Sequence, residues 1–327
     1  MTNVLVTGGA GYVGSHACKA LAAAGFTPVT FDNLERGKRD AVRWGPLVVG
    51  DLADRAALDA AFAQYQPVAV LHFAAYTYVG ESVEQPLRYY RNNTMGTLTL
   101  LDAMAAAGVD RLVFSSTAAT YGVPQSVPIP ESHPQQPVNP YGMSKLMVER
   151  IILDTAAASS LRAVMLRYFN AAAADPDGEI GENHDPETHL IPLVLDAVRG
   201  RIPHLTINGD DYDTPDGTCI RDYIHVTDLA DAHVRALRYL MDGGSTVALN
   251  LGNGTGFSIQ QVIEAAERVT GQAVPVTFGA RRPGDPSVLV GDPTRARQLL
   301  GWHPQRSDLD TQIADAWRWR KEDRVIN

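Results

Sequence analysis

Residues 4–15 have the sequence VLVTGGAGYVGS and lead into an alanine-rich stretch that continues to Ala24 and is closed by Gly25. The apolar, β-branched start is typical of a short strand, and the alanine-rich continuation is typical of a helix. The glycines between them fit G-x-G-x-x-G, starting at Gly9, and G-x-x-G-x-x-G, made by Gly8, Gly11 and Gly14. Glycines in such a turn let the backbone approach a pyrophosphate at the helix N-terminus. The stretch therefore predicts a dinucleotide-binding turn.

A second predicted strand, from Pro28 to Phe31, ends at Asp32. A carboxylate at this place hydrogen-bonds a ribose diol and repels a 2′-phosphate, which favours NAD over NADP. The cations Arg36, Lys38 and Arg39 follow closely and oppose that preference. We predict that Asp32 binds the ribose of NAD; the alternative is a solvated turn residue.

The alternation of strand and helix patterns continues along the first half of the chain. Further strands are predicted over residues 47–52, 68–75, 111–117 and 163–170, and a long helix from about 86 to 107. Continuous apolar strands are typical of a parallel sheet buried on both faces. The fold class is therefore α/β, with a Rossmann-type doubly wound parallel sheet. Asp51, Phe73 and Ala74 follow its strands and are expected at the ligand-binding edge.

The composition changes after Asn170, where residues 171–221 are rich in Asp, Glu, Pro, Gly and His. Strand patterns return at 221–226 and 248–252, which suggests that late segments rejoin the first sheet. We predict an NAD-binding domain of residues 1–170 plus 222–253. A smaller, discontinuous C-terminal substrate lobe is predicted from residues 171–221 plus 254–327. Its loop 281–285 carries adjacent arginines that suggest a phosphate-binding site.

Tyr141 and Lys145 lie at positions i and i+4 of a predicted helix and so share a face. An ammonium beside a phenol favours the phenolate, which makes the pair a base for a substrate hydroxyl near neutral pH. The hydroxyl cluster that ends the strand at 111–117, including Thr117, is expected beside this pair. The alternative is a tyrosine packed against a lysine stem.

The whole-chain composition limits the class of protein. The 327 residues carry a net charge of −9, which argues against nucleic acid as a partner. The two cysteines, Cys18 and Cys219, have no metal-binding spacing, so no metal site is predicted and a reducing compartment is favoured. The sequence has no uninterrupted apolar run of about 18 residues, so no membrane partner is indicated. We expect a cytoplasmic protein.

These motifs together resemble the extended short-chain dehydrogenase/reductases, and within them the 4-epimerases of UDP-sugars. The resemblance covers Val4 to about Trp319 and is carried by residues 4–15, 72–74, 79–83, 141–149, 166–170, 221–230 and 281–285.

The resemblance implies an enzyme that keeps NAD bound and interconverts the C4 epimers of a UDP-hexose, UDP-glucose and UDP-galactose above all. Tyr141 is then the base, Lys145 lowers its pKa, and Thr117 binds the 4-oxygen while hydride moves to NAD and back through a 4-keto sugar. The implied cofactor-binding residues are Gly8, Gly11, Tyr12, Val13, Gly14, Asp32, Asn33, Asp51, Leu52, Phe73, Ala74, Asn92, Tyr141, Lys145 and Tyr168. The implied substrate-binding positions are Thr117, Asn170, His189, Leu190, Asn208, Arg221, Arg282, Asp285 and Leu289.

The chain departs from the family pattern at several of these positions. Thr117 replaces a serine, Thr77 a lysine near the cofactor ribose, His189 an asparagine facing the diphosphate, and Asn208 an aromatic residue stacked on the base. Leu289 occupies a gate position, which leaves N-acetylated sugars open as substrates. The resemblance also implies a homodimer formed through helices near residues 86–107 and 141–157.

Three alternatives follow from the same residues. A 4,6-dehydratase needs an Asp-Glu acid pair beside the threonine, where this chain has Ala118 and Ala119, so we exclude it. An epimerase for UDP-N-acetylhexosamine, UDP-glucuronate or UDP-xylose needs only a different lobe. A non-catalytic NAD-sensing module need not keep both Tyr141 and Lys145.

Overall fold

A parallel sheet of seven strands forms the centre of the molecule in the computed structural model, which describes residues 2–282 and 285–321. The order β3, β2, β1, β4, β5, β6 reverses direction beside β1, the doubly wound arrangement that places ligands past the carboxyl ends of the strands. Across the sheet the strands are β11 (Val247–Leu251), β6 (Arg162–Tyr168), β5 (Arg111–Thr117), β4 (Val70–His72), β1 (Thr2–Thr7), β2 (Phe26–Asp32) and β3 (Leu47–Val49).

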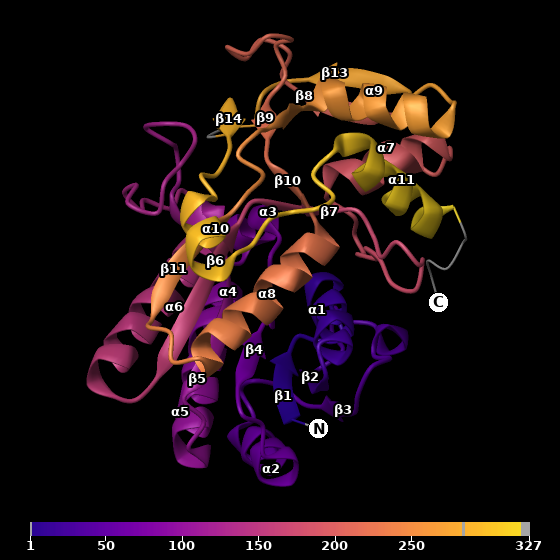
Figure 1. Cartoon of the computed structure of the whole chain (residues 1–327). Coiled ribbons are helices and arrows are strands. Elements are labelled where there is room, and N and C mark those ends of the chain that lie inside the picture. The colour runs from indigo at the N-terminus through magenta and orange to yellow at the C-terminus, as the bar shows by residue number, and fades with distance from the viewer. Residues whose placement is uncertain (1, 283–284, 322–327) are drawn as a thin grey trace.

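Helices cover both faces of this sheet (Figure 1). One apolar cluster joins the sheet to α1 (Tyr12–Ala23), α8 (Val226–Met241) and α10 (Thr294–Leu300). A second joins the opposite face to α2 (Arg55–Tyr65), α5 (Gly96–Ala107) and α6 (Pro140–Ala158). The predicted fold class is thus confirmed. Burial of the strands from both sides explains why the first half of the chain has continuous apolar strand sequences.

Several predicted element bounds were wrong. Strands predicted over 47–52 and 68–75 are β3, Leu47–Val49, and β4, Val70–His72. The predicted helix 86–107 is divided into α4 (Pro86–Tyr89), a π-helical segment η2 (Tyr90–Met95) and α5, and it follows the short α3 (Val79–Glu84). π-Helical turns occur frequently at functional sites. A short 3-10 segment, η1 (Arg39–Ala41), follows β2, and another, η3 (Ala118–Thr120), continues β5.

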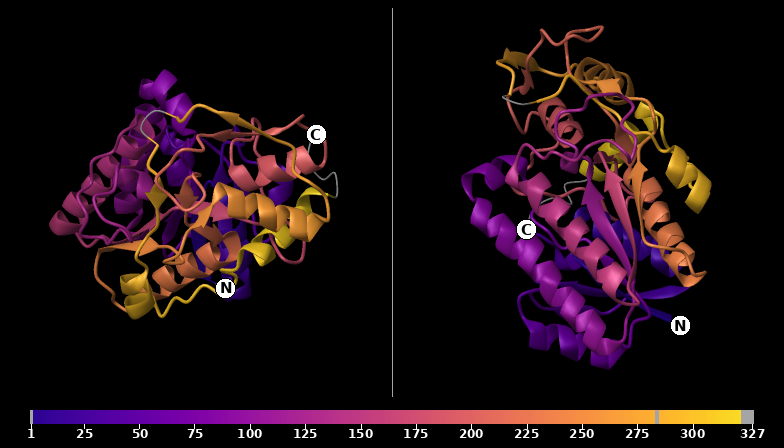
Figure 2. Two further views of the ribbon diagram at one scale, coloured as in Figure 1. Left: turned by 90° about the horizontal axis from the view of Figure 1, so that it is seen from above. Right: turned by 90° about the vertical axis from the view of Figure 1, so that its left-hand side faces the viewer.

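The remaining elements gather at one end of the molecule (Figures 1 and 2). There, α7 (Leu190–Val198), α9 (Ile259–Thr270) and α11 (Leu309–Arg320) enclose a separate apolar cluster. Short sheets join β8 (Leu205–Asn208) to β13 (Val276–Gly279), β9 (Ile220–Arg221) to β12 (Phe257–Ser258) and β14 (Val288–Leu289), and β7 (Asn170–Ala172) to β10 (Tyr223–His225). The single strand predicted at 221–226 is therefore two strands in different sheets.

Side chains cap the first turns of α9 and α8. Ser258 caps α9 in a capping box with Gln261. His225 caps α8, because its side chain accepts the hydrogen bond from the Thr227 amide. No helix within residues 2–282 and 285–321 is long and apolar enough to cross a membrane.

Candidate active site

The glycine turn packs so closely that side chains are excluded from it. A Cβ atom on Gly14 would lie 2.2 Å from the carbonyl oxygen of Gly8, and one on Gly8, where φ is +73°, would lie 2.5 Å from the amide nitrogen of Ala74. Gly11 caps α1 without a side-chain hydrogen bond, which leaves the first amides of the helix free of a side-chain partner there. The turn therefore presents backbone donors and fits the pyrophosphate of a dinucleotide.

The other predicted cofactor residues lie around this turn. Asp32 ends β2, and its carboxylate accepts hydrogen bonds from the amides of Ala10 and Leu34 at 3.0 and 2.9 Å. Burial raises its pKa, and these two bonds oppose the shift. The side-chain amide of Asn33 donates to the carboxylate of Asp51 at 2.8 Å. Tyr12 and Leu52 are buried, Val13, Phe73, Ala74 and Asn92 are half-buried, and the amides of Phe73 and Ala74 both donate to the carbonyl of Thr7. Thr77 is exposed.

Tyr141 is held beside Thr117 by a close approach of two elements. Asn139 caps α6 by accepting from the Gly142 amide at 2.8 Å. A Cβ atom at Gly142 would lie 2.5 Å from the carbonyl oxygen of Ala119, so a glycine is required for α6 to meet η3. Burial raises the pKa of the Tyr141 phenol to about 12, and a hydrogen bond with Thr117 opposes that shift. The phenol and the hydroxyl are thus paired at the carboxyl end of β5.

Lys145 lies one turn further along the same face of α6. Its Nζ donates to the carbonyl oxygen of Ser115 at 2.8 Å and lies 4.8 Å from the ring centre of Phe114. Burial lowers the pKa of Lys145 to about 7, and the charge of Glu149 opposes the shift. The sequence predicts a lowered pKa for Tyr141, whereas burial gives the opposite direction in the protein alone.

Two further groups surround the pair. The hydroxyl of Tyr168 lies 2.5 Å from Ser115 Oγ, and burial raises its pKa. Asn93 in η2 donates to Ser144 Oγ at 3.0 Å and accepts from the Tyr76 amide, so the π-helical segment ties the loop after β4 to α6. His72 is buried between Thr7 and Thr97.

A buried ion pair that the sequence analysis missed lies behind Lys145. Glu149 receives two hydrogen bonds from Arg167, at 2.9 and 2.6 Å, and one from Ser116 at 2.5 Å. Both charged side chains are almost fully buried. Glu149 follows Tyr141 and Lys145 at the same helical spacing, which is the one sequence signal that could have identified it.

The predicted substrate residues come from the lobe. Arg221, buried, forms an ion pair with Asp285 at 2.5 Å. The amide oxygen of Asn208, when it faces the guanidinium of Arg282, accepts hydrogen bonds from Nε and Nη2 at 3.2 Å each. Arg281 instead pairs with Asp211 at 2.6 Å. The adjacent arginines therefore have different partners, and residues 283–284 of the predicted loop lie outside the described residues.

Four other predicted substrate residues have the following surroundings. The amide of Asn170 donates to the Asp222 carbonyl, which joins β7 to the segment before β10. Leu289 packs against a small cluster that includes Tyr121 and Ile129. Leu190 begins α7, and His189 contacts the carboxylate of Glu182.

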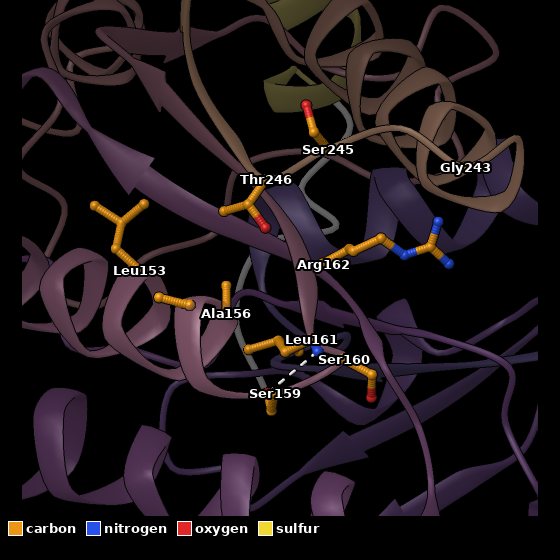
Figure 3. A pocket seen from close by; sticks show the side chains of 10 residues that line it. Leu153, Ala156, Ser159, Ser160, Leu161, Arg162, Gly243, Ser245 and Thr246 are labelled. Atoms are coloured by element: carbon orange, nitrogen blue, oxygen red, sulfur yellow. Dashed lines mark hydrogen bonds between the residues drawn. The ribbon is translucent and has the colours of Figure 1, made fainter.

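A separate cavity of about 610 Å³ has none of these residues in its lining. Figure 3 shows the residues that line it. It is lined by the C-terminal end of α6, including Leu153 and Ala156, and by Arg162 and Thr246. Tyr141 lies at the opposite end of this helix of 19 residues, roughly 20 Å away at 1.5 Å per residue. This cavity is therefore not the site of the predicted chemistry.

The glycine turn, the acid that ends β2 and the paired phenol and hydroxyl define a nicotinamide-dependent enzyme that acts on alcohols. Comparison with known proteins is consistent with that class. The model of the NAD dependent epimerase/dehydratase family matches residues 4–252. The chain belongs to this family, and NAD is its cofactor.

Individual relatives are similar over nearly their whole length. A protein of Rhizobium leguminosarum bv. trifolii named UDP-glucose 4-epimerase is 56% identical over 97% of this chain and 96% of its own. The structure of UDP-glucose 4-epimerase from Brucella ovis in complex with NAD has a TM-score of 0.95 and 55% identity, covering 97% of this chain and 98% of that one. The Bifidobacterium longum enzyme in complex with NAD+ and UDP has a TM-score of 0.92 and 37% identity, covering 98% and 99%.

Proposed function

We propose that the protein interconverts UDP-glucose and UDP-galactose by NAD-dependent epimerisation at C4. The observation that carries the proposal is the placement of Tyr141, Thr117 and Lys145 together at the carboxyl end of β5, the edge at which the glycine turn also lies. The relatives described above are named for this reaction, and the resemblance extends over nearly the whole chain.

The proposed roles of the residues follow from their chemistry. NAD, when bound, supplies the nicotinamide ring that accepts and returns the hydride at C4 of the sugar. The phenol oxygen of Tyr141 takes the proton of the 4-hydroxyl and later gives it back. Thr117 hydrogen-bonds the same sugar oxygen. Lys145 in its charged form favours the phenolate and so opposes the rise in pKa that burial causes.

The two ends of the substrate have different requirements. Both epimers must fit one pocket, so the sugar must be held by few contacts while the diphosphate is held by charge. We assign the diphosphate to Arg221 and Arg282, because a guanidinium binds phosphate through paired hydrogen bonds. Asp285 and Asn208 hold these two side chains. His189, Leu190, Asn170 and Leu289 complete the proposed substrate site.

The direct test is turnover of purified protein on UDP-galactose, compared with UDP-N-acetylgalactosamine, UDP-glucuronate and UDP-xylose. We expect UDP-galactose to give the highest kcat/KM. Nucleotide released by denaturing the purified protein should be NAD in about a one-to-one ratio with the chain. Loss of turnover on all four substrates, with NAD present, would instead favour the NAD-sensing module.

We also propose a homodimer formed by the flank that contains α3 to α6. Exposed apolar side chains lie on these neighbouring elements, and η2 and α5 run alongside α6 (Figure 2). The side chains are Val79, Val83, Leu87, Met95, Leu98, Met147 and Leu153. An apolar patch of this kind marks an interface in many proteins. Light scattering should give twice the chain mass, and Leu87→Asp together with Met95→Glu should give the monomer.

The proposal also includes a division of the chain into domains and a location in the cell. We divide the chain into the NAD-binding domain of residues 1–170 plus 222–253 and the lobe of 171–221 plus 254–327, of which residues 283–284 and 322–327 are not described. The separate apolar clusters of the sheet and the lobe support two units, but α10, which this division assigns to the lobe, packs in the cluster of the sheet. The thiols of Cys18 and Cys219 are free, which suits the cytoplasm, and cell fractionation tests that location.

A further inference from the structure

Four potential metal ligands converge in the loop between β7 and α7. Glu182, His184, Glu187 and His189 each offer one donor atom, and the four atoms lie within 4.8 Å of one another. Nδ1 of His184 lies 3.1 Å from Oε1 of Glu182 and 3.8 Å from Oε1 of Glu187, and Nδ1 of His189 contacts the same oxygen of Glu182. Two imidazole nitrogens and two carboxylates thus face a common point.

Hydrogen bonding within the described residues leaves part of this cluster unsatisfied. Nδ1 of His184 and Oε2 of Glu187 are buried and make no well-directed hydrogen bond to a described residue. Their nearest charged partners are Glu182, 3.1 Å from the imidazole nitrogen, and Arg320, 3.7 Å from the carboxylate oxygen. The side chains of Glu182 and Glu187 are only 5% and 8% exposed. Buried polar atoms are paired in most proteins, and an unpaired one in a native structure suggests an absent water or ion.

The charges of the surroundings also favour a cation. Arg320 lies 3.7 Å from Glu187, but its guanidinium is bound through two hydrogen bonds, at 2.8 and 2.6 Å, to Asp196. Two buried carboxylates close together need positive charge, which either two protonated imidazoles or one divalent ion can supply.

A second group of acids in the same loop already has a cation among its carboxylate oxygens. Nζ of Lys19 lies 2.8, 2.8 and 2.7 Å from carboxylate oxygens of Asp175, Asp177 and Glu179. The ammonium already occupies the centre of that group, so it offers no room for a metal ion. In the described part of the chain, no contact places a lysine or arginine at the centre of the four-ligand cluster.

We propose that Glu182, His184, Glu187 and His189 bind one divalent transition-metal ion, for which Zn²⁺ is the best match. Nitrogen and carboxylate ligands in a set of four suit Zn²⁺, whereas Mg²⁺ and Ca²⁺ prefer oxygen alone. The side chain of His189 is 43% exposed, which leaves a route from solvent. This inference revises the sequence-based expectation that the chain has no metal site, and it replaces the substrate-binding role proposed above for His189.

The position of the cluster indicates a structural role. His189 is the residue before the first turn of α7, and the carbonyl of Glu182 accepts a hydrogen bond from Trp319 of α11 at 3.3 Å. The ring of His184 lies edge-to-face with that of Tyr12 in the glycine turn, with centres 6.1 Å apart. An ion here would connect α7 and α11 of the lobe to the turn that binds the cofactor.

The test measures metal binding and does not depend on epimerase activity. Untagged full-length protein is treated with a chelator, dialysed and titrated with Zn²⁺ by calorimetry and with Co²⁺ by visible absorption. We expect one ion per chain, a tetrahedral Co²⁺ spectrum, and a higher melting temperature with Zn²⁺. His184→Gln should weaken binding at least tenfold, whereas His204→Gln, which changes an exposed histidine outside the cluster, should not.

Other results would overturn the proposal. They are the absence of saturable Zn²⁺ uptake by the original chain, equal affinity in the His184→Gln and His204→Gln proteins, or an anomalous zinc signal elsewhere in a crystal. If His184→Gln does not fold, Glu187→Gln takes its place, because it is nearly isosteric and removes one ligand charge. Any of these results would mean that His184 and His189 are only ion-pair partners of the glutamates. The proposed epimerase function would be unaffected.

Discussion

The ammonium of Lys145 donates to the main-chain carbonyl of Ser115, two residues before Thr117 on the same strand. One hydrogen bond therefore fixes α6 against the end of β5, and with it the relative positions of the phenol and the threonine hydroxyl. Lys145 therefore joins the two elements. The proposed function adds a second role, in which its charge favours the phenolate of Tyr141.

Replacement of Tyr141 by phenylalanine tests the base directly. The change removes one oxygen from a buried ring, so we expect kcat for UDP-galactose to fall by about 10² to 10⁴ while NAD remains bound. Coupled assay of UDP-glucose formation measures the loss. Tyr239→Phe, at the far end of α8, is the matched control and should keep full activity. Unchanged turnover by Tyr141→Phe would remove the catalytic assignment.

Replacement of Glu149 by glutamine tests the charge behind Lys145. The carboxylate raises the pKa of a lysine that burial lowers to about 7, so its loss lowers that pKa further. If charged Lys145 is required, activity declines as pH rises through its pKa, and in Glu149→Gln the decline should begin at lower pH. Loss of the buried partner of Arg167 should also reduce the free energy of unfolding by about 3–5 kcal/mol.

Ser116→Ala is the control for this experiment. It removes one hydrogen bond to Glu149 but keeps the charge, so it should lower stability by about 1 kcal/mol and leave the pH profile in place. A similar pH profile in all three proteins would mean that Glu149 serves only the packing of α6.

A Gly14→Ala substitution should separate cofactor binding from folding. The new methyl group would meet the Gly8 carbonyl at 2.2 Å and distort the turn, so we expect the purified protein to have lost most of its NAD. Absorbance of the released nucleotide gives the occupancy. At Gly80, which has no heavy atom within 4 Å of the added Cβ, the same change should leave NAD occupancy unaltered. Full occupancy in Gly14→Ala would contradict the role given to this turn.

The stability of the protein should fall in acid partly because of His16. Burial lowers the pKa of this histidine from 6.5 to about 4, so between these values the unfolded chain binds the proton and the folded chain does not. The stability associated with neutral His16 is fully present above pH 6.5 and is lost as pH falls towards 4. The loss is about 1.4 kcal/mol per pH unit. The free energy of unfolding of His16→Gln, measured with urea at several pH values, should depend less steeply on pH. The reason is that unfolding of this variant takes up about one proton fewer. His204→Gln should match the original slope.

Arg282→Ala should raise KM for UDP-galactose with little change in kcat, because a diphosphate contact far from C4 stabilises substrate and transition state alike. Asn208→Ala should produce a smaller rise through the loss of its hydrogen bonds to Arg282. Arg268→Ala, an exposed residue paired with Asp310, is the control. A fall in kcat without a change in KM would place Arg282 nearer the reacting carbon.

The sequence was sufficient for those features whose spacing reflects local geometry. Glycine positions, the acid that ends β2, and the interval between Tyr141 and Lys145 each follow from one turn or one helix, and the structure places them as expected. The ends of β3 and β4 could not be predicted, because apolar residues such as Phe73 continue past the point where the strand ceases to pair.

Features that depend on distant segments escaped prediction for a different reason. Glu149 and Arg167 meet only when α6 packs on β6, and the helical spacing of Glu149 indicates its face of α6 but not its partner. The rise in the pKa of Tyr141 comes from burial, which the spacing to Lys145 does not reveal. The pairs formed by Asp285 and Asn208 with the two arginines likewise depend on how the lobe folds.

The edge strand β11 has a consequence for how this protein is made. It pairs with β6, yet Val247–Leu251 leave the ribosome only after the segments of α7 and α8. Until then β6 has an open edge of unpaired backbone groups, which can associate with other extended chains. Synthesis that stalls before Val247 should therefore yield fragments prone to aggregation, and chaperone demand should peak late in translation.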